Sequence, residues 1–218
     1  MVSRNTKYVI SVALCIFYSQ AVSFATDYYV NAAGGNDGNS GQSSATPWRT
    51  IAKVNATSFA SGDRIFFARG GIWRETLLPR SSGVAGNPIT FGAYGSGAAP
   101  VLAGSNNLTS GYTWRKSASG TNTYYCYASG LQPPDTVWLN GVNCARGTAG
   151  SLADHRWDWA NRDSLGFYTV YIRDDSGSPG ATGVLIESAA RDYTVYASSK
   201  SYLTFENLEV RHTDDYGN

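Results

Sequence analysis

The chain has 218 residues, a formal net charge of +1 and only 15% charged residues. This sparse and nearly balanced charge provides no basic stripe for nucleic acid, so we expect no nucleic-acid partner. The 15 Tyr, 8 Phe and 6 Trp, together with 24 Gly, favour short strands joined by turns and therefore an all-β fold.

The N-terminal segment has the pattern of a secretory signal peptide. Arg4 and Lys7 precede an apolar run over residues 8–18, which is shorter than the ~20 residues of a membrane span. Ser23 and Ala25 are small residues at the positions that a signal peptidase reads. We predict cleavage after Ala25 and a secreted or periplasmic/extracellular protein without membrane contact; the alternative is an uncleaved anchor.

A short first strand is predicted over residues 27–30, followed by a loop over residues 34–41 (GGNDGNSG). Within this loop, Asp37 and its neighbouring asparagines offer the oxygen ligands that Ca²⁺ prefers. The same residue types are ordinary turn formers, and one carboxylate is few for such a site. The turn is therefore the favoured interpretation, and Ca²⁺ is kept as the cofactor candidate.

A short amphipathic helix is predicted over residues 47–54. Thr46 is the expected N-cap, and Pro47 occupies the first helical position. The expected apolar face consists of Trp48, Ile51 and Ala52. Such a helix can cover the open end of a stack of β-coils, which needs an apolar inner face and a polar outer face.

One pattern occurs twice between residues 62 and 104, at an interval of 24 residues. Residues 63–68 (DRIFFA) match residues 87–92 (NPITFG), and Leu77 matches Val101. A period in the low twenties built from short β-runs predicts a solenoid, in which each coil buries its interior by stacking on the next. The residues expected to point inward and stack in register are Ile65, Phe67, Leu77, Ile89, Phe91 and Val101.

These segments together resemble the N-terminal part of secreted right-handed parallel β-helix proteins of the pectin-lyase-like superfamily. The resemblance rests on residues 27–30 (DYYV), 46–51 (TPWRTI), 62–67 (GDRIFF) and 70–76 (GGIWRET). It covers residues 27–104 well and residues 184–218 more loosely. It implies a right-handed parallel β-helix, whereas it leaves the activity open, because such N-termini precede lyases, glycoside hydrolases and other proteins alike.

The interval of 24 residues is lost between residues 105 and 183, where we predict a β-rich insertion of antiparallel character. Asn140-Gly141 between apolar residues is a strong hairpin signal. Residues 157–159 and 167–172 are expected to form two further strands.

Two cysteines remain after removal of the signal peptide, Cys126 and Cys144. An even pair in an exported chain predicts a disulfide, which would join two adjacent strands of the insertion. The alternative is two buried free thiols.

The interval returns at the C-terminal end, where Val184 and Ile186 match Leu208 and Val210. Asn207 is expected at a corner that needs a left-handed backbone. Residues 202–210 have the pattern of an interior coil, so we expect the solenoid to be incomplete at this end. The predicted units are 1–25 (signal peptide), 26–61 (strand, loop and capping helix), 62–104 (first coils), 105–183 (insertion) and 184–218 (resumed coils).

The catalytic candidates Arg211, His212, Asp214 and Asp215 directly follow the strand predicted over residues 208–210. In the lyases that this chain resembles, acidic residues hold Ca²⁺ against the uronate carboxylate, and a Lys or Arg removes the neighbouring proton. That chemistry needs such residues stacked on successive coils, so a solvated turn is the alternative.

Aromatic residues of the insertion offer flat faces for sugar rings. The candidates are Trp138, Trp157 and Trp159, with Tyr168 and Tyr171 beside them. Aromatic residues in a small β-unit more often form its core, which is the alternative.

The sequence therefore favours an exported, carbohydrate-active β-helix protein with a polysaccharide partner. A lyase or hydrolase acting on acidic polysaccharide is the first hypothesis, with its active site in coils beyond the sequence. The alternative is a non-catalytic surface, adhesive or carbohydrate-binding β-helix protein.

Overall fold

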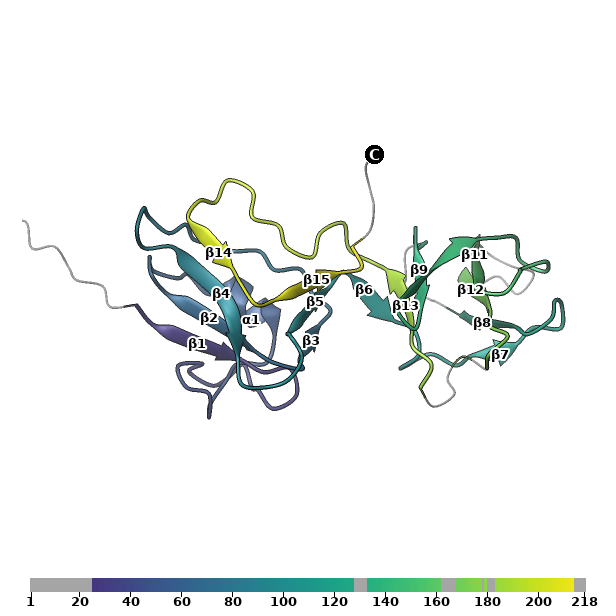
Figure 1. The fold of residues 1–218 in the computed structure, drawn as a ribbon, viewed down its shortest axis with the longest axis horizontal. Helices are drawn as coiled ribbons and strands as arrows, with labels where there is room; N and C mark the ends of the chain where they lie inside the picture. Colours follow the sequence, from purple (N-terminus) through teal and green to yellow (C-terminus); the bar gives the residue numbers. More distant parts are fainter. Residues whose placement is uncertain (1–24, 128–132, 162–167, 178, 180–182, 214–218) are drawn as a thin grey trace, which may run out of the picture.

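The computed structural model describes residues 25–127, 133–161, 168–177, 179 and 183–213 (Figure 1). The described chain is all-β with one short helix, and its strands gather in two lobes that lie side by side. No helix in the described ranges is long and apolar enough to cross a membrane. The predicted signal peptide, apart from Ala25, lies outside these ranges and stays a prediction.

The first lobe contains a four-stranded sheet in which every pairing is parallel. Its strands, in spatial order, are β1 (Asp27–Val30), β2 (Arg64–Ala68), β4 (Ile89–Tyr94) and β14 (Leu203–Phe205). Because parallel neighbours need a crossover connection, the chain leaves and re-enters this sheet between each pair of strands.

The crossovers pass through a second parallel sheet of the same lobe. It consists of β15 (Glu209–Arg211), β5 (Val101–Ala103) and β3 (Ile72–Trp73), in that spatial order. An isolated parallel bridge between Leu77 and Val195 is a third place where successive passes of the chain pair with each other. The chain visits these places in a constant order: β2, β3 and Leu77, then β4, β5 and Val195, then β14 and β15.

The six residues predicted to point inward are all buried, with exposed fractions of 7% or less, so their orientation is confirmed. Their register differs from the prediction. Ile65 lies opposite Phe91, and Val101 lies opposite Ile72 instead of Leu77. Side chains two residues apart point to the same face of a strand, so a pattern of buried residues leaves a two-residue slip undetermined.

The helix begins later than predicted. Helix α1 spans Ile51–Ala56, and its N-cap is Thr50, whose hydroxyl accepts a hydrogen bond from the Lys53 amide at 3.0 Å. Trp48 is extended because it bridges to Val30 of β1, which removes the preceding residues from the helix. The buried face consists of Ile51 and Val54, whereas Ala52 is exposed.

The second lobe is an eight-stranded mixed sheet in which β10 and β11 are parallel and the other pairings are antiparallel. In spatial order its strands are β6 (Ser105–Asn107), β13 (Ile186–Ala189), β9 (Val137–Leu139), β10 (Val142–Arg146), β11 (Arg156–Asn161), β12 (Tyr168–Arg173), β8 (Thr123–Tyr127) and β7 (Arg115–Lys116). The predicted hairpin is confirmed: Asn140 and Gly141 join β9 to β10 with φ values of 50° and 80°.

One sequence match at the C-terminal end does not correspond to a coil. Ile186 lies in β13 and is fully buried in the core of the second lobe, and Val210 is 52% exposed. The match of Val184 and Ile186 with Leu208 and Val210 is therefore not a structural repeat. By contrast, Asn207 has a φ of 58°, which confirms the predicted left-handed corner.

Candidate functional site

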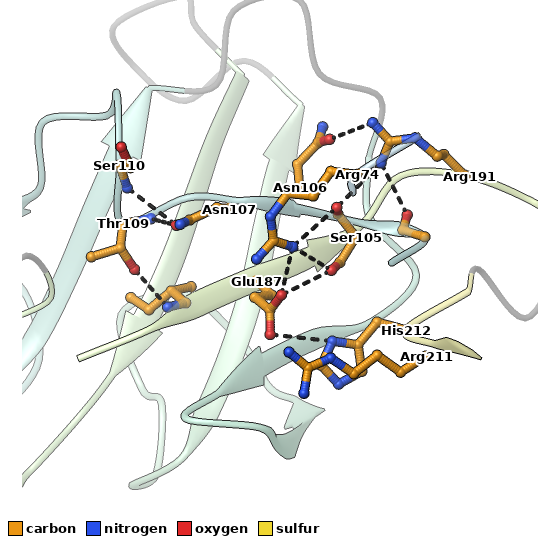
Figure 2. A network of polar contacts seen from close by, with 12 residues as sticks. Arg74, Ser105, Asn106, Asn107, Thr109, Ser110, Glu187, Arg191, Arg211 and His212 are labelled. Atoms are coloured by element: carbon orange, nitrogen blue, oxygen red, sulfur yellow. Dashed lines mark hydrogen bonds and ion pairs between the residues drawn. The ribbon is translucent and has the colours of Figure 1, made fainter. Parts of the chain in front are cut away.

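A buried ion pair connects the two lobes (Figure 2). Arg74 directly follows β3 of the first lobe, and its Nη1 donates to Oε1 of Glu187 in β13 at 2.6 Å. The same nitrogen donates to Oγ of Ser105 at 2.9 Å, and this hydroxyl donates to Glu187 Oε1 at 3.0 Å. The Glu187 side chain is 1% exposed and that of Arg74 is 22% exposed, so a largely buried ion pair holds the chain between β5 and Val195 to the first lobe.

His212, one of the predicted catalytic residues, belongs to this network. Its Nδ1 lies 3.2 Å from Glu187 Oε2, and its ring stacks on Trp138 with a centroid distance of 4.2 Å. The backbone at this point passes close to Gly104, where a Cβ atom would lie 2.7 Å from the His212 carbonyl oxygen. A residue without a side chain is therefore needed there to bring His212 into the network.

The charge states in the network follow from burial and pairing. Burial alone would raise the pKa of Glu187, but the hydrogen bond and charge of Arg74, with smaller contributions from His212 and Ser105, lower it overall. Burial lowers the pKa of His212 despite the nearby Glu187 carboxylate. Glu187 is thus ionised at neutral pH, whereas the general acid of a glycosidase needs a raised pKa. The network therefore links the two lobes with Glu187 in its ionised form.

Three adjoining hollows form a row along the first lobe. The first, ≈ 420 Å³, lies beside β14 and β15, the middle one is ≈ 410 Å³, and the third is ≈ 540 Å³. Asp192 and Tyr193 line both the first and the middle hollow, and Leu78 and Tyr196 line both the middle and the third. These shared walls make the row continuous, and we call it the tyrosine track.

The two tyrosines of the track are held by a rigid backbone. Leu77 donates its amide to the Thr194 carbonyl at 2.9 Å and accepts from the Tyr196 amide at 2.9 Å. The ring centroids of Tyr193 and Tyr196 lie 4.9 Å apart, and the two residues are 54% and 46% exposed. Large aromatic faces that are presented in this way to a hollow can stack on an apolar or amphipathic ligand.

No pattern in the sequence predicted this surface. Tyr193 and Tyr196 are three residues apart, so they would point to opposite faces of a regular strand. The segment instead makes one isolated bridge at Val195, which lets both rings reach the same surface. Only the chain fold, which returns this segment to Leu77, brings the hollows together.

The other predicted catalytic residues show no contact that would support a catalytic role, or they are not described. Arg211 ends β15, and its Nη1 lies 3.4 Å from Oε1 of Glu209 on the same strand. Asp214 and Asp215 lie outside the described residues. Of the two candidates that the structure describes, His212 is the one placed beside an ionisable side chain from a distant strand.

The three tryptophans predicted to face sugar rings are buried instead. Trp138, Trp157 and Trp159 are 9%, 1% and 7% exposed. Trp157 and Trp159 belong to the core of the second lobe, so the alternative of a packing role holds for them. Of the neighbouring tyrosines, Tyr168 begins β12, and the ring of Tyr171 packs beside that of Tyr125 at 5.8 Å.

Asp37, the Ca²⁺ candidate, is occupied by hydrogen bonds near the start of α1. Its carboxylate accepts from the amides of Arg49 and Thr50 at 2.7 and 3.0 Å and from the Thr50 hydroxyl at 2.7 Å. Burial would raise the pKa of Asp37, but these bonds and the charge of Lys53 lower it overall. These bonds fix the loop to the start of the helix, in keeping with the turn that the sequence favoured.

The predicted disulfide is not formed, because Cys126 and Cys144 are free thiols. They lie in β8 and β10, which are separated in the sheet by β11 and β12, so the expectation of adjacent strands is also corrected. Both are buried in the second core. Burial raises the pKa of Cys126 to about 12 and also raises that of Cys144.

We expect both thiols to resist alkylation in the folded chain, since the reactive thiolate is suppressed and inaccessible. Iodoacetamide at about pH 8 should label neither Cys126 nor Cys144 before denaturation and both of them afterwards. Site-resolved mass spectrometry is the measurement. A peptide in which Cys126 is disulfide-linked to Cys144 would contradict this expectation.

Part of this chain is similar in sequence to a known protein. Over 100 aligned positions, covering 43% of this chain, the sequence is 35% identical to a lacto-N-biosidase of Bifidobacterium longum subsp. longum. The chain spans only 6% of the length of that relative. No protein-family model matches the sequence.

Two solved structures share the fold over most of this chain. A structure of XylC in complex with xylose matches with a TM-score of 0.68 and 19% identity, over 86% of this chain and 35% of the other. A structure described as a glycoside hydrolase matches with a TM-score of 0.65 and 12% identity, over 87% of this chain and 51% of the other. At these identities the likeness concerns the fold alone.

Proposed function

We propose that this chain is exported, that it acts on carbohydrate and that the tyrosine track is its glycan-binding surface. The observation that carries the proposal is the continuous row of hollows walled by two half-exposed tyrosines. The sequence similarity to a lacto-N-biosidase supports a glycoside hydrolase as the class of enzyme, in preference to a lyase.

The scaffold of this surface is, in this proposal, a right-handed parallel β-helix. The repeated order of β2, β3 and Leu77, then β4, β5 and Val195, supports it, since each coil stacks parallel strands on the previous coil. The second lobe then lies within one coil, between β5 and Val195.

The lining of the track fits a glycan. The hollows lie within the usual range of ligand sites, about 300–1,000 Å³. Aromatic rings can pack against the apolar faces of sugars, while polar side chains pair with hydroxyl groups. Such polar groups occur in each hollow: Glu206 and Asn207 in the first, Arg191 in the middle and Lys200 in the third.

The charges of the first hollow favour a neutral sugar unit over an acidic one. Asp192 and Glu206 both line the first hollow, whose lining contains no Lys or Arg. A uronate bound there would place its carboxylate beside two others, which is unfavourable. The middle and third hollows contain Arg191, Arg80 and Lys200 and do not disfavour an acidic sugar. The proposal of a neutral oligosaccharide therefore rests on the first hollow and on the sequence similarity to a lacto-N-biosidase.

A non-catalytic glycan-binding protein is the second candidate. The track by itself supports it, because exposed aromatic rings and polar side chains are enough for binding. Binding and hydrolysis can be separated by experiment, because the first needs only the track and the second needs a suitably spaced pair of carboxyl groups.

Replacing Tyr193 or Tyr196 with Ala should weaken glycan binding by about fivefold each, because each loss removes a stacking face worth about 1 kcal/mol. Calorimetric titration with oligosaccharides carrying lacto-N-biose, with xylo-oligosaccharides and with pectate and alginate oligomers is the measurement. We expect binding of a neutral member of this panel.

The matched control is Tyr202→Ala, since Tyr202 is 55% exposed but lines none of the three hollows. Equal binding by all three variants would count against the track as the binding surface. Chromatography of the incubated neutral glycans then distinguishes the two candidates: released products support a hydrolase, and unchanged bound glycans support the non-catalytic protein.

A further inference from the structure

We propose that Asp154, His155 and Asp174 form a binding site for a divalent transition-metal cation in the second lobe. One ligand atom from each of the three lies within 4.8 Å of the other two. Asp154 and His155 directly precede β11, and Asp174 directly follows β12. Because these strands are antiparallel neighbours, with Trp157 opposite Ile172, the start of one meets the end of the other.

The buried carboxylate of Asp174 is the strongest indication of a missing ligand. Asp174 is 1% exposed, and its Oδ2 has no hydrogen-bond partner among the described residues. Its Oδ1 is occupied, since it accepts from the amide and the hydroxyl of Ser176 at 2.9 and 2.6 Å. A buried carboxylate oxygen without a partner is costly, and a bound cation would remove this cost.

The nearest arginine is already engaged elsewhere. Arg173 donates to both oxygens of Asp175, at 2.9 and 2.7 Å, and to the carbonyl of Leu152 at 3.1 Å. Its guanidinium therefore neutralises Asp175, and Asp174 is left without such a partner. Among the described residues Asp174 has no such cation, and one bound from solution would pair this second carboxylate.

The other two ligands are held in place by the surrounding backbone. The Asp175 amide donates to Asp154 Oδ1 at 2.8 Å, and Asp154 Oδ2 lies 2.9 Å from Nδ1 of His155. The His155 amide donates to the carbonyl of Arg173 at 3.1 Å, which ties this ligand to β12. Such contacts orient metal ligands before the metal binds. Asp154 and His155 are exposed, so the cation can enter from solvent.

The donor set selects the class of metal. Two carboxylates and one imidazole suit Zn²⁺ and related first-row cations, whereas Ca²⁺ takes six to eight oxygen ligands. Three protein ligands leave a fourth position for water in a tetrahedral Zn²⁺ site. The cation would join the β11 and β12 ends and stabilise the second lobe.

The test is a calorimetric titration of the chelator-treated 218-residue chain with Zn²⁺, and separately with Ca²⁺, alongside thermal unfolding. We expect Zn²⁺ to bind and to raise the unfolding midpoint. Asp174→Asn and His155→Asn should each weaken Zn²⁺ binding by roughly tenfold or more. The matched control is Asp135→Asn, an exposed acid of the same lobe outside the cluster, which should bind Zn²⁺ like the unchanged chain.

The Asp174→Asn variant also separates metal binding from folding. Asn keeps an acceptor for Ser176 and removes a buried charge, so its unfolding midpoint without metal should equal or exceed that of the unchanged chain. Only the increase caused by Zn²⁺ should disappear. Equal Zn²⁺ affinity in the cluster variants and in Asp135→Asn would overturn the site, as would no Zn²⁺ binding at all. Tighter binding of Ca²⁺ than of Zn²⁺ at these residues would overturn the metal class.

Discussion

Replacing Phe91 with Asp should unfold the first lobe. The Phe91 ring is fully buried in β4, and it stacks on Phe205 of β14 with a centroid distance of 5.1 Å and an interplanar angle of 11°. A carboxylate at this position would lie in an apolar interior without a partner, and such burial costs far more than a typical point substitution. Together with the loss of the ring, about 3–5 kcal/mol, the cost should approach or exceed the whole stability of a domain, about 5–15 kcal/mol.

Phe205→Asp is the matched control, because it places the same charge on the other ring of this stacked pair. Phe205 is 42% exposed, so an aspartate there can remain hydrated. Circular dichroism and thermal unfolding should show a cooperative transition for Phe205→Asp and none for Phe91→Asp. If Phe91→Asp unfolds at the midpoint of the unchanged chain, Phe91 does not lie in a close-packed core.

The orientation of these side chains was predictable because burial alone determines it. Alternating apolar residues such as Ile65 and Phe67 must face an interior in any packed β-structure. The register was not predictable, since Ile65 can lie opposite Ile89 or Phe91 with the same face buried. The helix start was misplaced for a related reason: Thr46-Pro47 has a local capping pattern, but the pairing of Trp48 with Val30 overrides it.

The candidate site was harder to predict because it depends on contacts between distant segments. Leu77 and Val195 are separated by the entire second lobe, and only their bridge brings Tyr193 and Tyr196 beside Leu78. Composition identified abundant aromatic residues without showing which are exposed. The three candidate tryptophans are buried, and the exposed tyrosines lie in a segment to which the sequence analysis assigned no binding role.

Replacing Arg74 with Met should destabilise the chain by about 3–5 kcal/mol at neutral pH, because it leaves Glu187 as a buried carboxylate without its cation. The matched control is Arg64→Met, which removes the ion pair with Asp27 in which the Arg64 side chain is 52% exposed. Exposed pairs contribute about 0–1 kcal/mol, so this variant should unfold almost like the unchanged chain. Denaturant unfolding of the variants measures both differences.

The destabilisation caused by Arg74→Met should depend on pH through the ionisation of Glu187. The folded pKa of Glu187 is lowered from 4.5, so its contribution is fully present above that value and is lost as the pH falls through the folded pKa. The penalty of Arg74→Met should therefore be largest at neutral pH and shrink in acid, where Glu187 is protonated in both proteins. Because the pKa of His212 is lowered in the folded chain, acid also destabilises the protein through this residue, but it does so with or without Arg74→Met.

A double variant, Arg74→Met with Glu187→Leu, should recover most of the lost stability, because no buried charge remains. A penalty that is constant with pH, or one that the second substitution does not reduce, would mean that the ion pair is not what holds the lobes together.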